Sequence, residues 1–122
     1  MKAVIYARLA EENPDRLTQQ IETLMQEVQK NPMIELSGVY SEFCNGITET
    51  PPPEMQKMVQ DCEKKGIRLV FVRDMSRIAG GYYDFAKRIK WFHRHNIAVW
   101  FMSENRSSLN MTKPVPVSEI FK

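Results

Sequence analysis

Three arginine residues lie where apolar segments of this chain end, and together they could bind a phosphate group. Arg8 follows the apolar residues 2–7, while Arg73 and Arg77 lie at the end of the segment that starts at Ile67. A guanidinium offers a planar fork of donors that matches the oxygens of a phosphate. If both segments are strands of one parallel sheet, we expect the guanidiniums to meet, because ligands gather beyond the carboxyl ends of such strands. The alternative interpretation is that these are ordinary solvated loop charges.

Hydrophobic periodicity predicts the elements that would position these arginines. Short apolar runs, typical of buried strands, alternate with segments whose apolar residues recur at helical spacing. This alternation predicts an α/β fold, in which a mainly parallel sheet of four or five strands is covered by helices on both faces. The expected strands are 2–7, 33–41, 67–73 and 97–102, and the expected helices are 14–30, from Pro51–Pro53 to Gly66, and 82–95.

Several residue types indicate how these helices begin, end and pack. Asn13 is expected to be the N-cap of the first helix with Pro14 in its first turn, and Gly66 is expected to end the second helix. Methionines are expected to fill irregular gaps in the core, with an adaptable partner surface as the alternative. These methionines are Met25, Met33, Met55, Met58 and Met75.

Length, charge and cysteine content narrow the class of protein. The 122 residues fit one domain, placed at residues 1–104, with residues 105–122 as a loosely ordered tail or an edge strand at Val115–Val117. A net charge of +2 does not by itself indicate a nucleic-acid-binding protein. No apolar run approaches the ~20 residues that span a bilayer, so no membrane partner is expected. Cys44 and Cys62 are interpreted as free thiols, which favours the cytoplasm.

Four segments of the chain resemble motifs of the serine recombinases, the resolvase/invertase family. Tyr6-Ala7-Arg8-Leu9-Ala10 resembles the opening Tyr-x-Arg-Val/Leu-Ser motif, and Leu17 to Leu24 resembles Leu-x-x-Gln-x-x-x-Leu. Tyr40 to Gly46 resembles Tyr/Phe-x-Asp-x-x-x-Gly, with Glu42 in the aspartate's place. Val72 to Gly80 resembles Val-x-Lys-Leu-Asp-Arg-Leu-x-Arg. The likeness spans residues 3–104 and implies a resolvase-like three-layer sandwich.

The resemblance also implies that the attacking group is missing. In the family, the serine of the opening motif attacks a DNA phosphate and holds the cut strand, but this chain has Ala10 at that position. A methyl group cannot be a nucleophile. The hydroxyls of Thr18 and Ser76 are not expected to replace it, because neither residue is placed on the turn after the first strand.

Some of the other active-site positions of the family are matched in this chain, and others are not. Arg8 and Arg77 match phosphate-binding arginines, Arg73 lies beside them, and Gln20 and Tyr6 match supporting positions. The third arginine of the pattern, near Pro51, is absent. Gly80 replaces the fourth arginine and Ser76 replaces an aspartate. Phosphoryl transfer depends on cations that neutralise developing charge, so these losses favour natural degeneration of the site over an engineered serine replacement.

The function that the resemblance implies is that of a resolvase/invertase-type domain, tied to DNA recombination and mobile elements. We expect it to be a catalytically inactive pseudoenzyme that remains as a regulatory or partner-binding domain. One alternative is an active recombinase domain captured as a Ser-to-Ala variant. The other is an unrelated small α/β module that binds phosphate or protein.

The expected partners follow from the same resemblance. They are a second copy of the chain, a full-length recombinase and DNA, which would bind weakly without a DNA-binding domain. No cofactor is expected, and no metal, because His93 and His95 point to different sides of a helix. The same helix carries a basic face, for which solvation is the default interpretation and contact with a DNA backbone the alternative. This face comprises Lys87, Arg88, Lys90 and Arg94.

Overall fold

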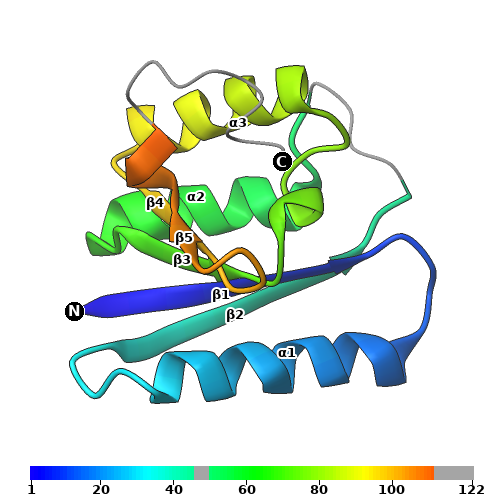
Figure 1. Ribbon diagram of the computed structural model, residues 1–122, viewed down its shortest axis with the longest axis horizontal. Coiled ribbons are helices and arrows are strands. Elements are labelled where there is room, and N and C mark those ends of the chain that lie inside the picture. The colour runs from blue at the N-terminus through cyan, green and yellow to red at the C-terminus, as the bar shows by residue number, and fades with distance from the viewer. Residues whose placement is uncertain (46–49, 112–122) are drawn as a thin grey trace.

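The computed structural model describes residues 1–45 and 50–111 and has the predicted α/β architecture. One helix covers one face of a five-stranded sheet, and two helices cover the other (Figure 1). The strands are β1 (Lys2–Leu9), β2 (Glu35–Phe43), β3 (Leu69–Val72), β4 (Ala98–Phe101) and β5 (Arg106–Ser107). The helices are α1 (Pro14–Gln29), α2 (Pro53–Lys65) and α3 (Tyr82–Arg94), with short 3-10 helices η1 (Met75–Arg77) and η2 (Ser108–Met111).

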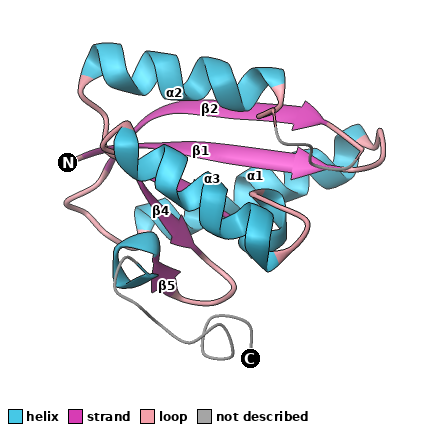
Figure 2. Ribbon diagram, turned by 90° about the horizontal axis from the view of Figure 1, so that it is seen from above, coloured by secondary structure: helices cyan, strands magenta, loops and turns pink. Residues whose placement is uncertain are grey.

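The strand order places β1 at the centre of the sheet. It reads β2-β1-β3-β4-β5, with β1 to β4 parallel and β5 antiparallel to β4. Figure 2 shows β1 and β2 running side by side with their carboxyl ends at the same edge. The chain moves from β1 to β2 on one side and then to β3 on the other. This reversal creates a crevice beyond the carboxyl ends of β1 and β3, where such sheets commonly bind ligands.

Because β1 is central, its side chains build two separate cores. Val4 and Tyr6 are fully buried against α2 and α3, while Ala3 and Ile5 are fully buried against α1. Alternate residues of a strand point to opposite faces, so Arg8 lies on the same face as Tyr6. The strand therefore places a cation at the carboxyl edge, on the side that α2 and α3 cover.

The helix ends match the predicted capping residues. The side chain of Asn13 accepts a hydrogen bond from the Arg16 N–H at 3.1 Å, and Pro14 occupies the first turn of α1. Gly66 ends α2 in the left-handed region, with φ at 69°, which favours glycine. The start of α1 and the end of α2 therefore have local causes that the sequence displays.

Some expectations were wrong at the level of single residues. Met55 and Met58 are fully buried core residues, but Met25 is 36% exposed and Met33 is 76% exposed. Met33 lies in the turn between α1 and β2, where no second layer covers it. Strand β2 runs to Phe43, past the predicted end at residue 41, so Glu42 belongs to the strand.

The carboxyl-terminal part is described only to residue 111. The edge strand predicted at Val115–Val117 lies outside the described residues, and the fifth strand of the structure is β5. The domain boundary at residue 104 stays a prediction. Within residues 1–45 and 50–111, no helix is long and apolar enough to cross a membrane, and no group of His, Cys, Asp and Glu could hold a metal ion. In this part, neither Cys44 nor Cys62 forms a disulfide bond.

Candidate functional site at the carboxyl edge of the sheet

The fold brings the sequence-predicted arginines together at the crevice beyond β1 and β3. Arg8 lies near the end of β1, Arg73 directly follows β3, and Arg77 closes η1. The Nη1 of Arg77 donates to the carbonyl oxygen of Arg8 at 3.1 Å. Residues 69 positions apart are thus held in direct contact.

The guanidinium of Arg8 is bound by the protein itself. Its Nη1 donates to the carbonyl oxygen of Cys44 at 2.6 Å, and its Nη2 donates to that of Ser76 at 3.0 Å. The residue is only 7% exposed, and its buried Nε has no hydrogen-bond partner among the described residues. Arg8 therefore links the end of β2 to η1, and two of its donor atoms are not presented to a ligand.

Arg77 lies in a cluster of positive charge. Burial lowers the pKa of Arg77, the Asp74 carboxylate raises it, and the positive charges of Arg73, Arg8 and Arg16 lower it further. Its Nε lies 3.5 Å from a carboxylate oxygen of Asp74. Such a cluster costs electrostatic free energy that a bound anion would relieve.

Gln20 holds the backbone of Arg8 from the other side. Its Oε1 accepts from the Arg8 N–H at 3.1 Å and its Nε2 donates to the Arg8 carbonyl at 3.3 Å. The side chain comes from α1 and is 5% exposed. The Arg8 carbonyl thus accepts from both Gln20 and Arg77, which fixes the end of β1 relative to α1 and η1.

Tyr6 and Glu42 form a second buried contact beneath this edge. The Tyr6 hydroxyl donates to Glu42 Oε2 at 2.7 Å. The two carboxylate oxygens of Glu42 also accept from the N–H groups of Glu54 and Met55, each at 3.2 Å. Burial, followed by the Glu42 contact, raises the pKa of Tyr6 well above its usual range. The N-cap of α2 is Pro52, which makes no side-chain cap bond, so Glu42 supplies the cap from β2.

Ala10 is exposed directly after β1 and carries no group that could attack phosphorus. Ser76 lies at the same edge, where its carbonyl accepts from Arg8 and its hydroxyl donates to Asp74. That hydroxyl belongs to the cap of η1, because Asp74 also accepts from the Ser76 N–H at 2.9 Å. Thr18 lies exposed on α1.

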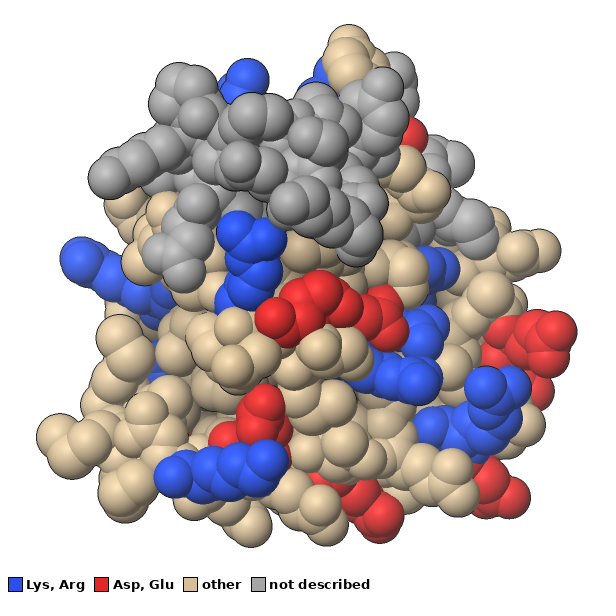
Figure 3. All heavy atoms as spheres, in the orientation of Figure 1, with Lys and Arg blue, Asp and Glu red and all other residues tan. Residues whose placement is uncertain are grey.

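The structure adds Arg16, which the sequence analysis did not single out. A hollow of about 450 Å³ lies on the α1 side of the crevice, with cationic and polar walls. Figure 3 shows Lys and Arg side chains gathered over the end where α1 begins, with acidic side chains beside them. Helical spacing of residues 16, 19, 20 and 23 could have indicated this face. The lining residues are Leu9, Arg16, Gln19, Gln20, Thr23, Arg73, Met102 and Ser103.

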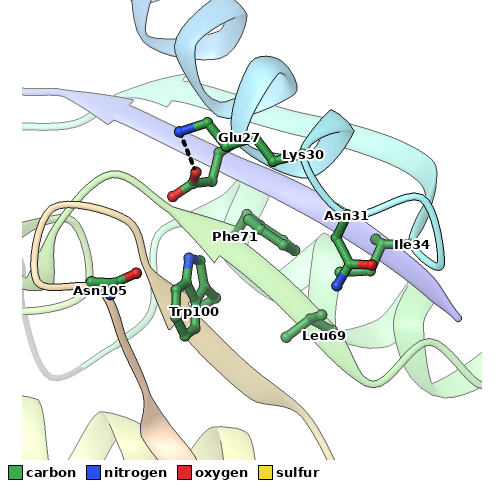
Figure 4. Close-up of a pocket in the computed structure, with 8 residues that line it drawn as sticks. All are labelled: Glu27, Lys30, Asn31, Ile34, Leu69, Phe71, Trp100 and Asn105. Carbon is green, nitrogen blue, oxygen red and sulfur yellow. Dashed lines mark ion pairs between the residues drawn. The ribbon is translucent and has the colours of Figure 1, made fainter.

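A different hollow of about 270 Å³ lies where α1 ends, against β3 and β4. Figure 4 shows Trp100 and Leu69 on the sheet below, with Asn31 and Asn105 at the rim. Its one cation, Lys30, forms an ion pair with Glu27 at 3.2 Å. The apolar floor and the paired cation distinguish it from the Arg16 hollow, and it does not suit a phosphate.

Comparisons with known proteins agree with this arrangement. The family model described as "Resolvase, N terminal domain" matches residues 3–118, which is a match of sequence and not of architecture alone. No curated protein sequence matches the chain.

Solved structures match over most of the chain. The N-terminal catalytic domain of TP901-1 integrase has a TM-score of 0.75 at 20% identity, covering 99% of this chain and 88% of that one. A resolvase family site-specific recombinase from Streptococcus pneumoniae has a TM-score of 0.73 at 17% identity, covering 98% and 83%. The C-terminal catalytic domain of ISC1926 TnpA, an IS607-like serine recombinase, has a TM-score of 0.70 at 18% identity, covering 84% and 69%. At these identities the likeness shows the fold.

Proposed function

This chain belongs to the family of resolvase N-terminal domains, and from that premise we propose that it is a recombinase-type domain that does not cut DNA. It acts in the cytoplasm by binding a full-length recombinase or a second copy of itself, and it binds DNA phosphate weakly. The observation that carries this proposal is the methyl group of Ala10 at the end of β1, where the family pattern has its attacking serine.

The hydrogen bonds of the two matching arginines support the same proposal. The guanidinium of Arg8 donates to the carbonyls of Cys44 and Ser76, and that of Arg77 donates to the Arg8 carbonyl. A catalytic site would direct such donors at the charge that develops on the transferring phosphoryl group. Here these donors bind backbone carbonyls of the protein itself, which suits a structural role better than transition-state stabilisation.

In this proposal, the cations at the rim of the crevice bind phosphate weakly. Arg73 has a side chain that is 45% exposed, and Arg16 is exposed on the first turns of α1. Both line the 450 Å³ hollow, together with the amide of Gln19 and the hydroxyls of Thr23 and Ser103. Two exposed cations supply a small number of phosphate contacts, so the affinity for DNA is low and falls with salt.

The test is strand cleavage on a supercoiled plasmid that carries the DNA flanking the gene, followed by a denaturing gel. The native chain is expected to leave the plasmid intact and form no covalent protein–DNA adduct. An adduct from the native chain would overturn the proposal. The Ala10→Ser variant, fused to a DNA-binding region, is also expected to be inactive, because the arginine at Gly80 and the aspartate at Ser76 are still missing. Rescue by Ala10→Ser would instead establish the alternative of a recombinase captured as a Ser-to-Ala variant.

A further inference from the structure

A basic groove on α3 lies apart from the carboxyl-edge crevice and shares no lining residue with it. Its volume is about 430 Å³. Four cations, one carboxylate, one indole and one proline line it, and all but the proline come from α3. They are Asp84, Lys87, Arg88, Lys90, Trp91, Arg94 and Pro51. Four positive charges against one negative charge favour an anionic occupant.

The helical period explains why these cations converge. Residues 87, 90, 91 and 94 are spaced i, i+3, i+4 and i+7, so they lie on one face of α3. The opposite face of the helix carries Phe85, Ile89 and Phe92 into the core. Because the apolar face packs into the core, the orientation of α3 about its axis is fixed. The long side chains of Lys90 and Arg94 therefore lie on one exposed surface.

The inner wall of the groove consists of packed side chains. Arg88 is only 5% exposed, its Nη1 contacts the Met55 sulfur at 3.1 Å, and its guanidinium lies 5.8 Å from the centre of the Trp91 ring. Trp91 also packs against Phe92 and His95, with ring centres 5.0 and 5.5 Å apart. Burial lowers the pKa of Arg88, and the nearby Asp84 carboxylate opposes that change. The inner wall of the groove therefore presents a buried cation beside an indole ring.

We propose that this groove binds phosphoryl groups, supplied either by a nucleic-acid backbone or by a free nucleotide, through Lys90 and Arg94. Both residues are exposed, and neither has an ion pair among the described residues. Trp91 provides a surface on which an attached base can stack, as aromatic side chains do in proteins that bind single-stranded nucleic acids. This inference does not depend on the proposed lack of cleavage activity.

Asp84 makes one end of the groove less positive than the other. Its carboxylate lies near the start of α3, whereas Arg94 lies at the helix end. The phosphate is therefore expected towards Lys90 and Arg94, away from that carboxylate. The negative end of the helix dipole also lies there, but its effect is limited to the last turn and is smaller than that of two full charges.

The test measures binding of a 20-base-pair DNA duplex and of ADP to the full chain at several salt concentrations. Lys90→Gln/Arg94→Gln is expected to weaken duplex binding about tenfold at low salt and to lower the slope of log K against log salt by about 2, since each phosphate contact contributes about 0.9. The matched control is Lys2→Gln/Lys30→Gln, which removes the same net charge from exposed positions outside the groove. Equal weakening by both pairs would overturn the proposal, because it would mean non-specific attraction only.

Two further measurements separate the possible occupants. The indole N–H resonance of Trp91 is expected to shift on titration while that of Trp100, which lines the other hollow, stays in place. Dependence of ADP binding on Lys90 and Arg94 would assign a nucleotide, and dependence of duplex binding alone would assign a nucleic-acid backbone. Competition by polyglutamate as strong as that by duplex would overturn the phosphate assignment in favour of an acidic protein segment.

Folding and site specificity are checked with two more variants. Lys90→Arg/Arg94→Lys preserves both charges and is expected to retain binding. Arg16→Gln/Arg73→Gln alters the carboxyl-edge hollow and is expected to leave the Trp91 shift unchanged. Loss of that shift in the second variant would overturn the inference, whereas plasmid cleavage by the native chain would overturn the proposed function alone.

Discussion

Arg77 donates a hydrogen bond from its Nη1 to the carbonyl oxygen of Arg8 at 3.1 Å, which links the two arginines that the sequence resemblance predicts to bind phosphate. Since Arg8 in turn donates to the carbonyls of Cys44 and Ser76, the pair joins β1, β2 and η1. Arginines of an active site normally present their donors to substrate. In this chain these contacts make the pair part of the structural framework, and the following predictions test that role.

Arg8→Ala is expected to destabilise the fold by about 2–3 kcal/mol, because it removes two charge-assisted hydrogen bonds and leaves their carbonyl acceptors unpaired. The free energy of unfolding in urea measures this change. Arg16→Ala is the control, since Arg16 is exposed and its loss is expected to change stability by less than about 0.5 kcal/mol. An unchanged urea midpoint for Arg8→Ala would contradict the structural role.

Glu42→Gln is expected to cost about 1–2 kcal/mol, since it removes the negative charge that caps the N-terminus of α2. Tyr6→Phe removes only the hydroxyl bond to the same carboxylate and is expected to cost about 1 kcal/mol. Because both residues share one contact, the double variant is expected to cost less than the two single variants added together. Strict additivity in thermal or urea unfolding would show that the contact contributes nothing.

His93 is expected to make stability depend on pH. Burial lowers its pKa below the ordinary 6.5, so the unfolded chain binds the proton more readily than the folded chain. The contribution of His93 is therefore complete above about pH 6.5 and decreases as the pH falls through the folded-state value. His93→Gln should flatten this part of a stability-against-pH curve. A curve that keeps its slope in His93→Gln would rule out this origin.

The geometry around His93 gives a reason for that dependence. Its Nε2 lies 2.9 Å from the Ser108 hydroxyl, which accepts from the Val99 N–H at 2.8 Å. The hydroxyl proton is then available for an unprotonated Nε2. Protonation of His93 would turn Nε2 into a donor, so the hydroxyl proton of the fully buried Ser108 would lose this acceptor.

The two cysteines are expected to react at very different rates. Cys62 is fully buried, and burial raises the pKa of its thiol to about 11, so little thiolate is present near neutral pH. Cys44 is partly exposed. A thiol-specific reagent at pH 8 should therefore modify Cys44 rapidly and Cys62 only on unfolding. Mass spectrometry of the labelled peptides would measure both reactions. Rapid modification of Cys62 in the folded chain would contradict the buried position.

Local patterns predicted most of the fold but only part of the candidate site. Asn13 and Gly66 act on neighbouring backbone groups, so their roles could be inferred from a few adjacent residues. The partners of Arg8 are backbone carbonyls 36 and 68 residues away, and every residue type carries such a carbonyl. No residue pattern distinguishes Cys44 or Ser76 as acceptors. The sequence therefore indicated where the arginines lie, but not that their donors are used inside the fold.

Tertiary packing also limited what the sequence could predict for other residues. Met33 and Met55 are the same residue type, yet one is 76% exposed in a turn and the other fully buried in a helix. Arg16 was missed because its significance comes from Arg73, a residue that directly follows β3 and lines the same hollow. Such pairings depend on tertiary structure, and a single sequence without relatives for comparison does not contain them.

The capping of α2 by Glu42 affects how freely the connecting segment can change during evolution. Helices commonly depend on the residue just before their first turn, so an insertion there shifts or frays the start. Here the start is held from a neighbouring strand, and Pro52 only directs the chain into the helix. We expect related domains to vary in length between these two points while the helix keeps its register, provided that an acidic side chain remains at the strand end.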